Sequence, residues 1–478
     1  MRGRGWFDRL LSSIADRGRN WVRIPTDEPP LEQAHQLSRA LLSERGEASG
    51  AALARALVEV YHLLDEDDRN SFHLYLAREF VPNTANLRDA AEAYLRDSSA
   101  DAAMLIAEAA EPPRQELLRR MNMAPRGTAT LVAMRANLAS ELRQNPALKP
   151  LDADLRHLLA SWFNRGFLEL KRIDWHTPAA VLEKLIDYEA VHEIQGWDDL
   201  RRRLAPDRRC FAFFHPALAD EPLIFVEVAL VQGIASAIQP LLARGEATIS
   251  EANADTAIFY SISNCQRGLR GISFGNFLIK QVVEDLKQEL PKLSRFSTLS
   301  PVPGFRSWLE KRAKDSDWEM LKPEERSALA ELAGEGEHEP LLLALTSRPN
   351  WHQDIGLASA VRAPLMRLCA EYLTDPQDGK GPSDPVARFH LGNGAVLERI
   401  NFLGNLAARG LKESFGLMVN YLYDLDRIEA NHEIFVRDGA VAHSSGVAEL
   451  MRPAKPSRSM GQLLSLGRDR RSAIDGGD

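Results

Sequence analysis

The stretch from Tyr260 to Phe305 limits the possible folds of this chain more than any other part of it. It reads YSISNCQRGLRGISFGNFLIKQVVEDLKQELPKLSRFSTLSPVPGF. A β-rich run leads into a glycine-containing turn, apolar residues then recur at helical spacing, and a second β-rich run, FSTLS, follows. Strands that are separated by a helix predict a mixed β-sheet flanked by helices, which indicates an α/β or α+β domain.

Further short runs that are rich in β-branched and aromatic residues predict more strands of this sheet. They are CFAFFHPAL from Cys210, LIFVEVALV from Leu223, TAIFYSIS from Thr256 to Ser263, and ARFHL from Ala387 to Leu391. The segments 323–333 and 364–373 are predicted to be helical.

The region from about residue 31 to residue 170 has a different pattern. Its apolar residues recur at three- and four-residue spacing, which predicts an irregular all-helical bundle. Gly46, Pro82, Pro112 and Pro146 mark helix ends within it. We find no fixed repeat period and no cluster of His, Cys or acidic residues spaced for chemistry, so a packing or self-association role is favoured.

Composition excludes several classes of protein. The 478 residues carry a formal net charge of −8, which argues against broad nucleic-acid binding. No apolar run reaches about eighteen residues, so we expect no membrane span. The three cysteines, Cys210, Cys265 and Cys369, have no metal-like spacing and indicate a reducing compartment. The first twenty residues are arginine-rich but contain two aspartates, so a transit peptide is disfavoured and the cytoplasm is expected.

The turn after the strand at Tyr260 is a candidate anion site. Gly268, Gly271 and Gly275 permit close backbone approach, and unpaired N–H groups at a helix start attract phosphate. Arg267 and Arg270 add cationic groups beside the turn. The turn matches neither a Walker P-loop nor the dinucleotide pattern, so a plain tight turn remains an alternative.

Ser300 and His390 are the candidate reactive side chains. Ser300 lies in LSPVPGF, where two prolines and a glycine restrict the backbone and hold the hydroxyl at a set angle. His390 ends a predicted strand and titrates near neutral pH when unperturbed, as an acid or base requires. Ser297 and His215 are the alternatives, and a turn serine and a structural histidine are the plain interpretations.

The chain resembles the malonyl-CoA decarboxylase family, and in particular a bacterial-type member of it. The resemblance lies in several long, ordered segments: FFHPALADEPLIFVEVAL, FYSISNCQRGLRGISFGNFLIKQVV, LSPVPGF, FHLGNGAVLERINFLGN and GLMVNYLYDL. It implies a helical N-terminal oligomerisation domain over 1–168, then a catalytic acyl-CoA-binding domain over 169–454 that resembles the CoA-dependent N-acetyltransferase fold. The tail 455–478 is expected to be disordered.

The resemblance also implies an activity and a set of site residues. The reaction is malonyl-CoA to acetyl-CoA and CO₂, with Ser300 orienting the malonyl group and His390 protonating the enolate-like intermediate. The CoA pyrophosphate is expected on a turn made of Arg270, Gly271, Ile272, Ser273, Phe274, Gly275 and Asn276. No metal or further cofactor is implied, because CoA is part of the substrate.

The partners and location follow from the same resemblance. A homo-oligomer, by family analogy a tetramer, is expected, with no nucleic acid and no membrane as partner. Animal members of the family resemble organelle-targeted enzymes with a peroxisomal signal; this sequence ends in IDGGD, so a cytoplasmic enzyme is expected. Two alternatives stay open, an acyl-CoA-dependent acetyltransferase and a non-catalytic acyl-CoA-binding scaffold, because fold alone does not settle function.

Overall fold

The computed structural model describes residues 28–43, 45–218, 220–245, 250–272, 278–315, 319–334, 340–376 and 381–452. The arginine-rich first twenty residues and the predicted tail 455–478 lie outside these ranges. The chain divides into two compact units, Met1–Leu299 and Ser300–Asp478, which we describe one at a time. The predicted domain boundaries at 168 and 454 stay predictions.

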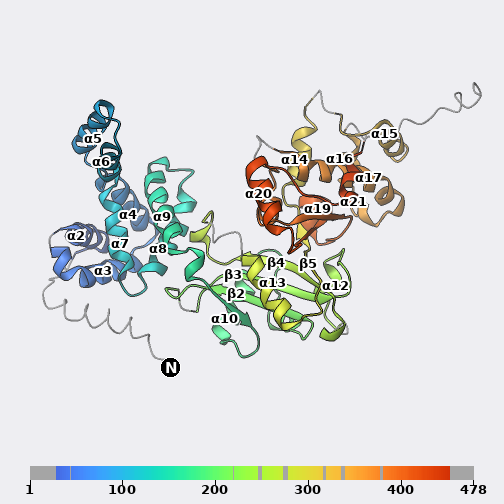
Figure 1. Cartoon of the computed structure of the whole chain (residues 1–478), viewed down its shortest axis with the longest axis horizontal. Coiled ribbons are helices and arrows are strands. Elements are labelled where there is room, and N and C mark those ends of the chain that lie inside the picture. Colours follow the sequence, from blue (N-terminus) through green and yellow to red (C-terminus); the bar gives the residue numbers. More distant parts are fainter. Residues whose placement is uncertain are drawn as a thin grey trace, which may run out of the picture. The chain divides into compact units, whose positions relative to one another are not determined.

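The first unit begins with the predicted helical bundle, coloured blue to teal in Figure 1. Its helices are α2 (Pro30–Leu42), α3 (Arg45–Leu63), α4 (Glu66–Glu79), α5 (Thr84–Arg96), α6 (Ala100–Ala110), α7 (Pro113–Asn122), α8 (Gly127–Glu141) and α9 (Lys149–Trp162). The apolar stripes of α2, α3, α4, α7, α8 and α9 meet in one core that includes the fully buried Leu57, Leu76, Leu117 and Leu131. Burial of such stripes is the main force that holds short helices together. The predicted helical region is confirmed.

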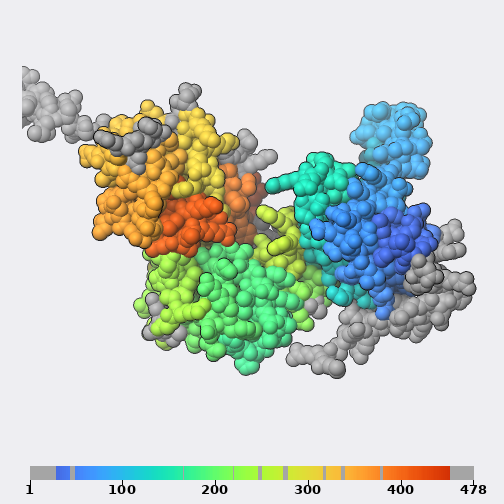
Figure 2. Space-filling model, turned by 180° about the vertical axis from the view of Figure 1, so that it is seen from behind, coloured from blue at the N-terminus to red at the C-terminus, as the bar shows by residue number. Residues whose placement is uncertain are grey.

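Helices α5 and α6 form a hairpin that projects from the rest of the bundle (Figures 1 and 2). Asn83 and Ser99 cap the two helices by accepting backbone N–H bonds, so the hairpin is well terminated. Its apolar side chains are nevertheless exposed: Leu95 is 82% accessible and Met104 is 60% accessible. A contiguous set of exposed apolar residues is typical of a protein–protein contact surface.

Five strands of the first unit follow the bundle. In sheet order they are β1 (Glu169–Ile173), β2 (Arg208–Phe214), β3 (Pro222–Val231), β4 (Thr256–Asn264) and β5 (Arg295–Thr298). The first four pair antiparallel, and β4 pairs parallel with β5 because helix α13 (Leu278–Glu289) connects them. Helices α10 (Ala179–Tyr188) and α11 (Trp197–Arg203) pack on the sheet through a shared apolar core. The strands predicted from Cys210, Leu223 and Thr256 are confirmed.

The second unit contains shorter strands and many helices. Its elements are β6 (Ser300–Pro301), α14 (Phe305–Arg312), α15 (Pro323–Ala330), α16 (Leu341–Thr346), α17 (Ile355–Thr374), α18 (Pro385–Gly392), β7 (Val396–Asn401), α19 (Ala408–Ser414), β8 (Met418–Leu422), α20 (Ile428–Asp438) and α21 (Ser445–Met451). Strand β8 pairs antiparallel with both β6 and β7. The predicted fold class, a helical region followed by a mixed sheet flanked by helices, is confirmed. No helix in the described ranges has the length and apolar character of a membrane span.

The predicted strand Ala387–Leu391 is wrong, because this segment is the helix α18. Asp384 accepts hydrogen bonds from the N–H groups of Val386 and Ala387, and Pro385 occupies the first turn. An Asp cap followed by proline is a helix start signal, and it overrides the β-propensity of the short apolar run. Helix α17 also begins earlier than predicted and contains Pro364 in its interior.

A cluster of buried charges lies in the sheet of the first unit. Arg203 of α11 pairs with Glu227 of β3 at 2.6 Å and with Asp199 at 3.3 Å, and both Arg203 and Glu227 are essentially inaccessible to solvent. Burial, together with the nearby Glu189 and Asp199 carboxylates, raises the pKa of Glu227 to about 8, although Arg203 opposes the rise. Glu227 therefore loses its proton at a higher pH in the folded protein than in the unfolded chain.

Glu227→Gln should flatten the pH dependence of stability. Between the ordinary pKa of a glutamate and about 8, the folded state holds a proton that the unfolded state has lost, so the free energy of unfolding falls as the pH rises. In the wild type, Glu227 lowers the free energy of unfolding by at most about 1.4 kcal/mol for each unit of pH. Urea unfolding at pH 6, 7 and 8 measures it, with Glu251→Gln as the control at a half-exposed site. Equal slopes in the wild type and Glu227→Gln would contradict the assignment.

Candidate active site

The second unit brings Ser300 and His390 together, although ninety residues separate them in sequence. The Ser300 Oγ lies 3.1 Å from the His390 Nε2, within hydrogen-bond distance. Both side chains are buried, at 5% and 3% accessibility. A paired hydroxyl and imidazole in a buried position can exchange a proton, which two separate surface residues cannot.

Ser300 is held by strand pairing and by the prolines that follow it. It begins β6, where it is in register with Val419 of β8. Pro301 and Pro303 fix the backbone just after it, and α14 begins at Phe305. Strand pairing and the two prolines therefore restrict the backbone that carries the hydroxyl.

His390 is held by the last turn of α18 and by two tyrosines. Its Nδ1 lies 2.8 Å from the hydroxyl of Tyr423, and the ring of Tyr421 stacks on the imidazole with centroids 4.8 Å apart. Tyr421 lies in β8, and Tyr423 directly follows the last residue of this strand. Tyr423 is the site residue that the sequence analysis missed; the alternation in NYLYDL is the signal that could have found it.

Burial controls the charge of this site. Desolvation lowers the pKa of His390 to about 3, so the imidazole is neutral at physiological pH. Desolvation also raises the pKa of Tyr423 well above its ordinary value, so its hydroxyl keeps the proton. The site is therefore a chain of neutral groups, Tyr423, His390 and Ser300, joined through both ring nitrogens.

A second set of buried polar groups supports the helix that carries His390. Besides capping α18, the Asp384 carboxylate accepts a hydrogen bond from the Tyr372 hydroxyl at 3.2 Å. Burial raises the pKa of Asp384. Gly304 fits beside Tyr372 only because it lacks a side chain: a Cβ there would lie 2.3 Å from the tyrosine oxygen. This contact ties the Ser300 turn to the start of α18.

The alternative residues lie elsewhere, in the first unit. The Ser297 Oγ donates to the carbonyl oxygen of Thr298 within β5. The His215 Nε2 contacts the carbonyl oxygen of Trp162 at 3.1 Å, and its ring packs on Phe163. Both positions are explained by local structure.

The predicted phosphate turn is described only in part. The 3-10 helix η4 (Arg267–Leu269) leads to Arg270 and Gly271, both exposed, and to Ile272, which is buried. Gly271 has φ +79°, a left-handed conformation that favours glycine. Ser273, Phe274, Gly275 and Asn276 lie outside the described residues. Their predicted role stays a prediction.

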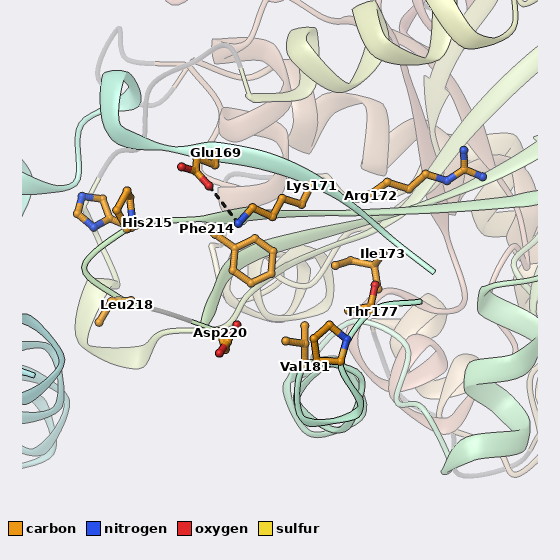
Figure 3. Close-up of a pocket in the computed structure, with 12 residues that line it drawn as sticks. Glu169, Lys171, Arg172, Ile173, Thr177, Val181, Phe214, His215, Leu218 and Asp220 are labelled. Atoms are coloured by element: carbon orange, nitrogen blue, oxygen red, sulfur yellow. Dashed lines mark ion pairs between the residues drawn. The ribbon is translucent and has the colours of Figure 1, made fainter. Parts of the chain in front are cut away.

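A cavity of about 340 Å³ opens beside β1 in the first unit. Figure 3 shows Lys171 between the carboxylate of Glu169 and the ring of Phe214, with Val181 facing the same hollow. Of the residues considered for catalysis, only His215, the alternative histidine, lines this cavity. Within the described ranges, no group of three or more His, Cys, Asp or Glu side chains is arranged to hold a metal ion.

Comparison with known proteins gives one consistent match. The family model of the malonyl-CoA decarboxylase C-terminal domain matches residues 166–461, and that of the N-terminal domain matches residues 80–163. The chain is 39% identical over 336 residues to the mitochondrial malonyl-CoA decarboxylase of Anser anser anser, covering 68% of this chain and 66% of that protein. It is 37% identical over 374 residues to the Rattus norvegicus enzyme, covering 75% and 76%.

The solved structures agree with the sequence matches. The crystal structure of malonyl-CoA decarboxylase from Rhodopseudomonas palustris is 51% identical, with a TM-score of 0.80, and the match covers 88% of this chain and 99% of that chain. The sequence match thus spans about two thirds of the length of the goose relative, while the structural match spans nearly all of the bacterial one.

Asp384→Ala should destabilise the second unit and displace His390. The variant loses the α18 cap and leaves the Tyr372 hydroxyl without its acceptor, at a cost of about 1–3 kcal/mol in the free energy of unfolding. Asp384→Asn keeps a side-chain oxygen that can cap the helix and serves as the matched control, with a smaller loss expected. Denaturant unfolding measures both. A wild-type stability for Asp384→Ala would contradict the role of the cap.

Proposed function

The chain belongs to the malonyl-CoA decarboxylase family, and from this we propose that it converts malonyl-CoA to acetyl-CoA and CO₂, using Ser300 and His390. The observation that carries the proposal is the buried Ser300–His390 contact of 3.1 Å, with Tyr423 bonded to the other ring nitrogen. The family relation supports the substrate and the reaction, and the geometry supports the assignment of roles.

The proposed reaction breaks one carbon–carbon bond and forms one carbon–hydrogen bond. The malonyl carboxylate leaves as CO₂, and the electron pair stays on the α-carbon, delocalised into the thioester carbonyl as an enolate. A proton added to that carbon gives acetyl-CoA. The site must therefore orient the carboxylate out of the carbonyl plane, exclude water and deliver a proton.

Ser300 is the proposed orienting residue. If Nε2 of the neutral imidazole carries its hydrogen, it donates to the Ser300 oxygen, and the serine O–H is then able to donate to the malonyl group. A donor held in a buried site interacts more strongly with developing negative charge than one in water, because little solvent screens it. The rigid turn after Ser300 supports this role.

His390 is the proposed proton donor to the product carbon. Because its pKa is about 3, it acts as a neutral N–H acid and not as an imidazolium. An enolate is a far stronger base than imidazole, so it can take the Nε2 proton if Nδ1 gains one at the same time. The Tyr423 hydroxyl, 2.8 Å from Nδ1, is placed to supply it, because the enolate is a strong enough base to draw a proton through the chain. The tyrosinate that results takes a proton from solvent before the next turnover. Tyr423 is therefore proposed as a positioning and relay residue.

The CoA portion is proposed to bind at the 270–276 turn. Arg270 and Gly271 are exposed, and the left-handed glycine allows a phosphate to approach the backbone closely. No cofactor beyond the CoA of the substrate is proposed, because the thioester carbonyl itself accepts the electron pair.

Self-association through the helical domain is a further part of the proposal. The exposed Leu95, Met104 and Leu105 of the α5–α6 hairpin support contact with other copies of the chain, and a tetramer remains the proposed state. The three buried cysteines are not joined in disulfides, which supports a reducing location, for which we propose the cytoplasm; the goose and rat relatives are mitochondrial by name.

Purified protein should release CO₂ from malonyl-CoA with no acceptor present. The assay supplies malonyl-CoA with a labelled carboxyl group, measures the labelled CO₂ that is released and measures acetyl-CoA by chromatography. The two products should appear in equal amounts. An acetyltransferase would require an added amine and keep the carboxyl carbon in its product, and a binding scaffold would retain the ligand with no turnover. Either result would reject the proposed activity. Methylmalonyl-CoA in parallel assays measures acyl preference.

His390→Ala should lower kcat by roughly 10²- to 10⁴-fold while CoA affinity stays within about twofold, because its proposed role lies in the chemical step and not in holding CoA. Tyr423→Phe, which removes only the hydroxyl, should lower kcat by a smaller factor. The wild-type kcat/KM should show no inflection near pH 6.5, since burial holds the pKa of His390 near 3. Wild-type turnover of His390→Ala, or an inflection at pH 6.5, would remove a neutral His390 from the mechanism.

A further inference from the structure

Helix α8 of the helical bundle contacts the predicted phosphate turn directly. The residues that make the contact, Val132 and Arg135, are one turn apart on α8 and face η4 of the catalytic region. A Cβ added to Gly268 would lie 1.9 Å from the carbonyl oxygen of Val132, so only glycine fits there. Packing against the bundle therefore requires glycine at position 268.

Arg135 binds two carbonyl oxygens of the turn. Its Nη1 donates to the oxygen of Gly268 at 2.7 Å and to the oxygen of Arg270 at 3.0 Å. Its Nε donates to the Asp152 carboxylate of α9 at 2.9 Å, which sets the direction of the guanidinium. Arg135 is only 8% accessible, so these bonds are largely shielded from water.

These bonds determine which way the turn presents its donors. In a trans peptide the C=O and the following N–H point in opposite directions. With the Arg270 oxygen held by Arg135, the N–H of Gly271 points away from the bundle, on the exposed side of the turn. A cation on the carbonyl also polarises the peptide and makes that N–H a better donor to an anion.

We propose that Arg135 is a positioning residue for CoA: it holds the 268–271 backbone so that the turn offers the Gly271 N–H to the substrate phosphates. This inference rests on the proposed function of the turn. It gives the helical bundle a part in substrate binding that is separate from self-association.

Arg114 provides a matched control within the same bundle. It is also buried, pairs with Asp154 of α9 and donates to the carbonyl oxygen of Phe80 at 3.2 Å. Asp154 lies two residues from Asp152 on the same helix, so both arginines bridge α9 to a neighbouring backbone. Arg114 bonds Ala77, Phe80 and Asp154, which all belong to the bundle, whereas Arg135 also bonds the turn.

The test compares malonyl-CoA with malonyl-pantetheine, which carries the thioester but none of the phosphates. Arg135→Gln should raise KM for malonyl-CoA by roughly tenfold, change kcat by less than about threefold and leave kcat/KM for malonyl-pantetheine unaltered. Arg135→Lys, which keeps the charge but cannot hold both carbonyls and Asp152, should give an intermediate KM. Arg114→Gln should lower the Tm and leave the ratio of kcat/KM for malonyl-CoA to kcat/KM for malonyl-pantetheine unaltered.

If Arg135→Gln, like Arg114→Gln, lowers kcat/KM by the same factor for malonyl-CoA and malonyl-pantetheine, the role of Arg135 is purely structural and the inference is overturned. If Arg135→Gln fails to fold, Arg135→Lys replaces it in the test. A wild-type ratio of the two kcat/KM values in Arg135→Lys would then overturn the inference. Arg270→Ala tests the phosphate-binding role of the turn separately from the positioning role of Arg135. If Arg270→Ala raises KM for malonyl-CoA while Arg135→Gln does not, only the positioning role fails. If Arg270→Ala changes nothing, the turn does not bind the phosphates and both assignments fall.

Discussion

The N-terminal cap of α18 is the interaction on which the geometry of the candidate site depends. The Asp384 carboxylate bonds two backbone N–H groups at the helix start and the Tyr372 hydroxyl beside the Ser300 turn. One buried carboxylate thus sets the direction of the helix that carries His390 and the spacing to the segment that carries Ser300. Without it, neither local propensity nor the short apolar run of 387–391 would place the imidazole against the serine.

Burial explains why the site is built from neutral groups. Three aromatic or imidazole rings, His390, Tyr421 and Tyr423, pack against each other with little access to water. In that environment a charged imidazole is strongly disfavoured, while hydrogen bonds between neutral partners are strengthened. Such a chain of groups suits the proposed chemistry, since a proton must reach a carbanion and a standing positive charge is not needed.

The first unit shows a comparable use of buried arginines. Arg203 offsets carboxylates inside the sheet, Arg114 joins helices within the bundle, and Arg135 joins the bundle to the turn after β4. In each case the planar guanidinium bonds several oxygens at once, which a lysine cannot do with the same geometry. Of the three, Arg135 links the bundle to the turn after β4 by directional polar contacts.

The sequence by itself determined the properties that depend on neighbouring residues. The helical spacing of 31–170, the strands from Cys210, Leu223 and Thr256, and the rigid turn after Ser300 all follow from short-range patterns. The same reasoning misassigned 387–391, because it weighed β-propensity above the Asp384–Pro385 start signal. The resemblance to a known family named Ser300 and His390 as a pair, which spacing alone left open.

Only the tertiary structure decided the contacts between distant segments. The 3.1 Å approach of Ser300 to His390, the bond to Tyr423 and the neutral state of the imidazole all require chain segments that lie far apart in sequence. The same holds for Arg135, whose carbonyl partners are more than a hundred residues away. Patterns along a chain report which faces will be buried, but not what they are buried against, and it is the partner that determines hydrogen bonding and pKa.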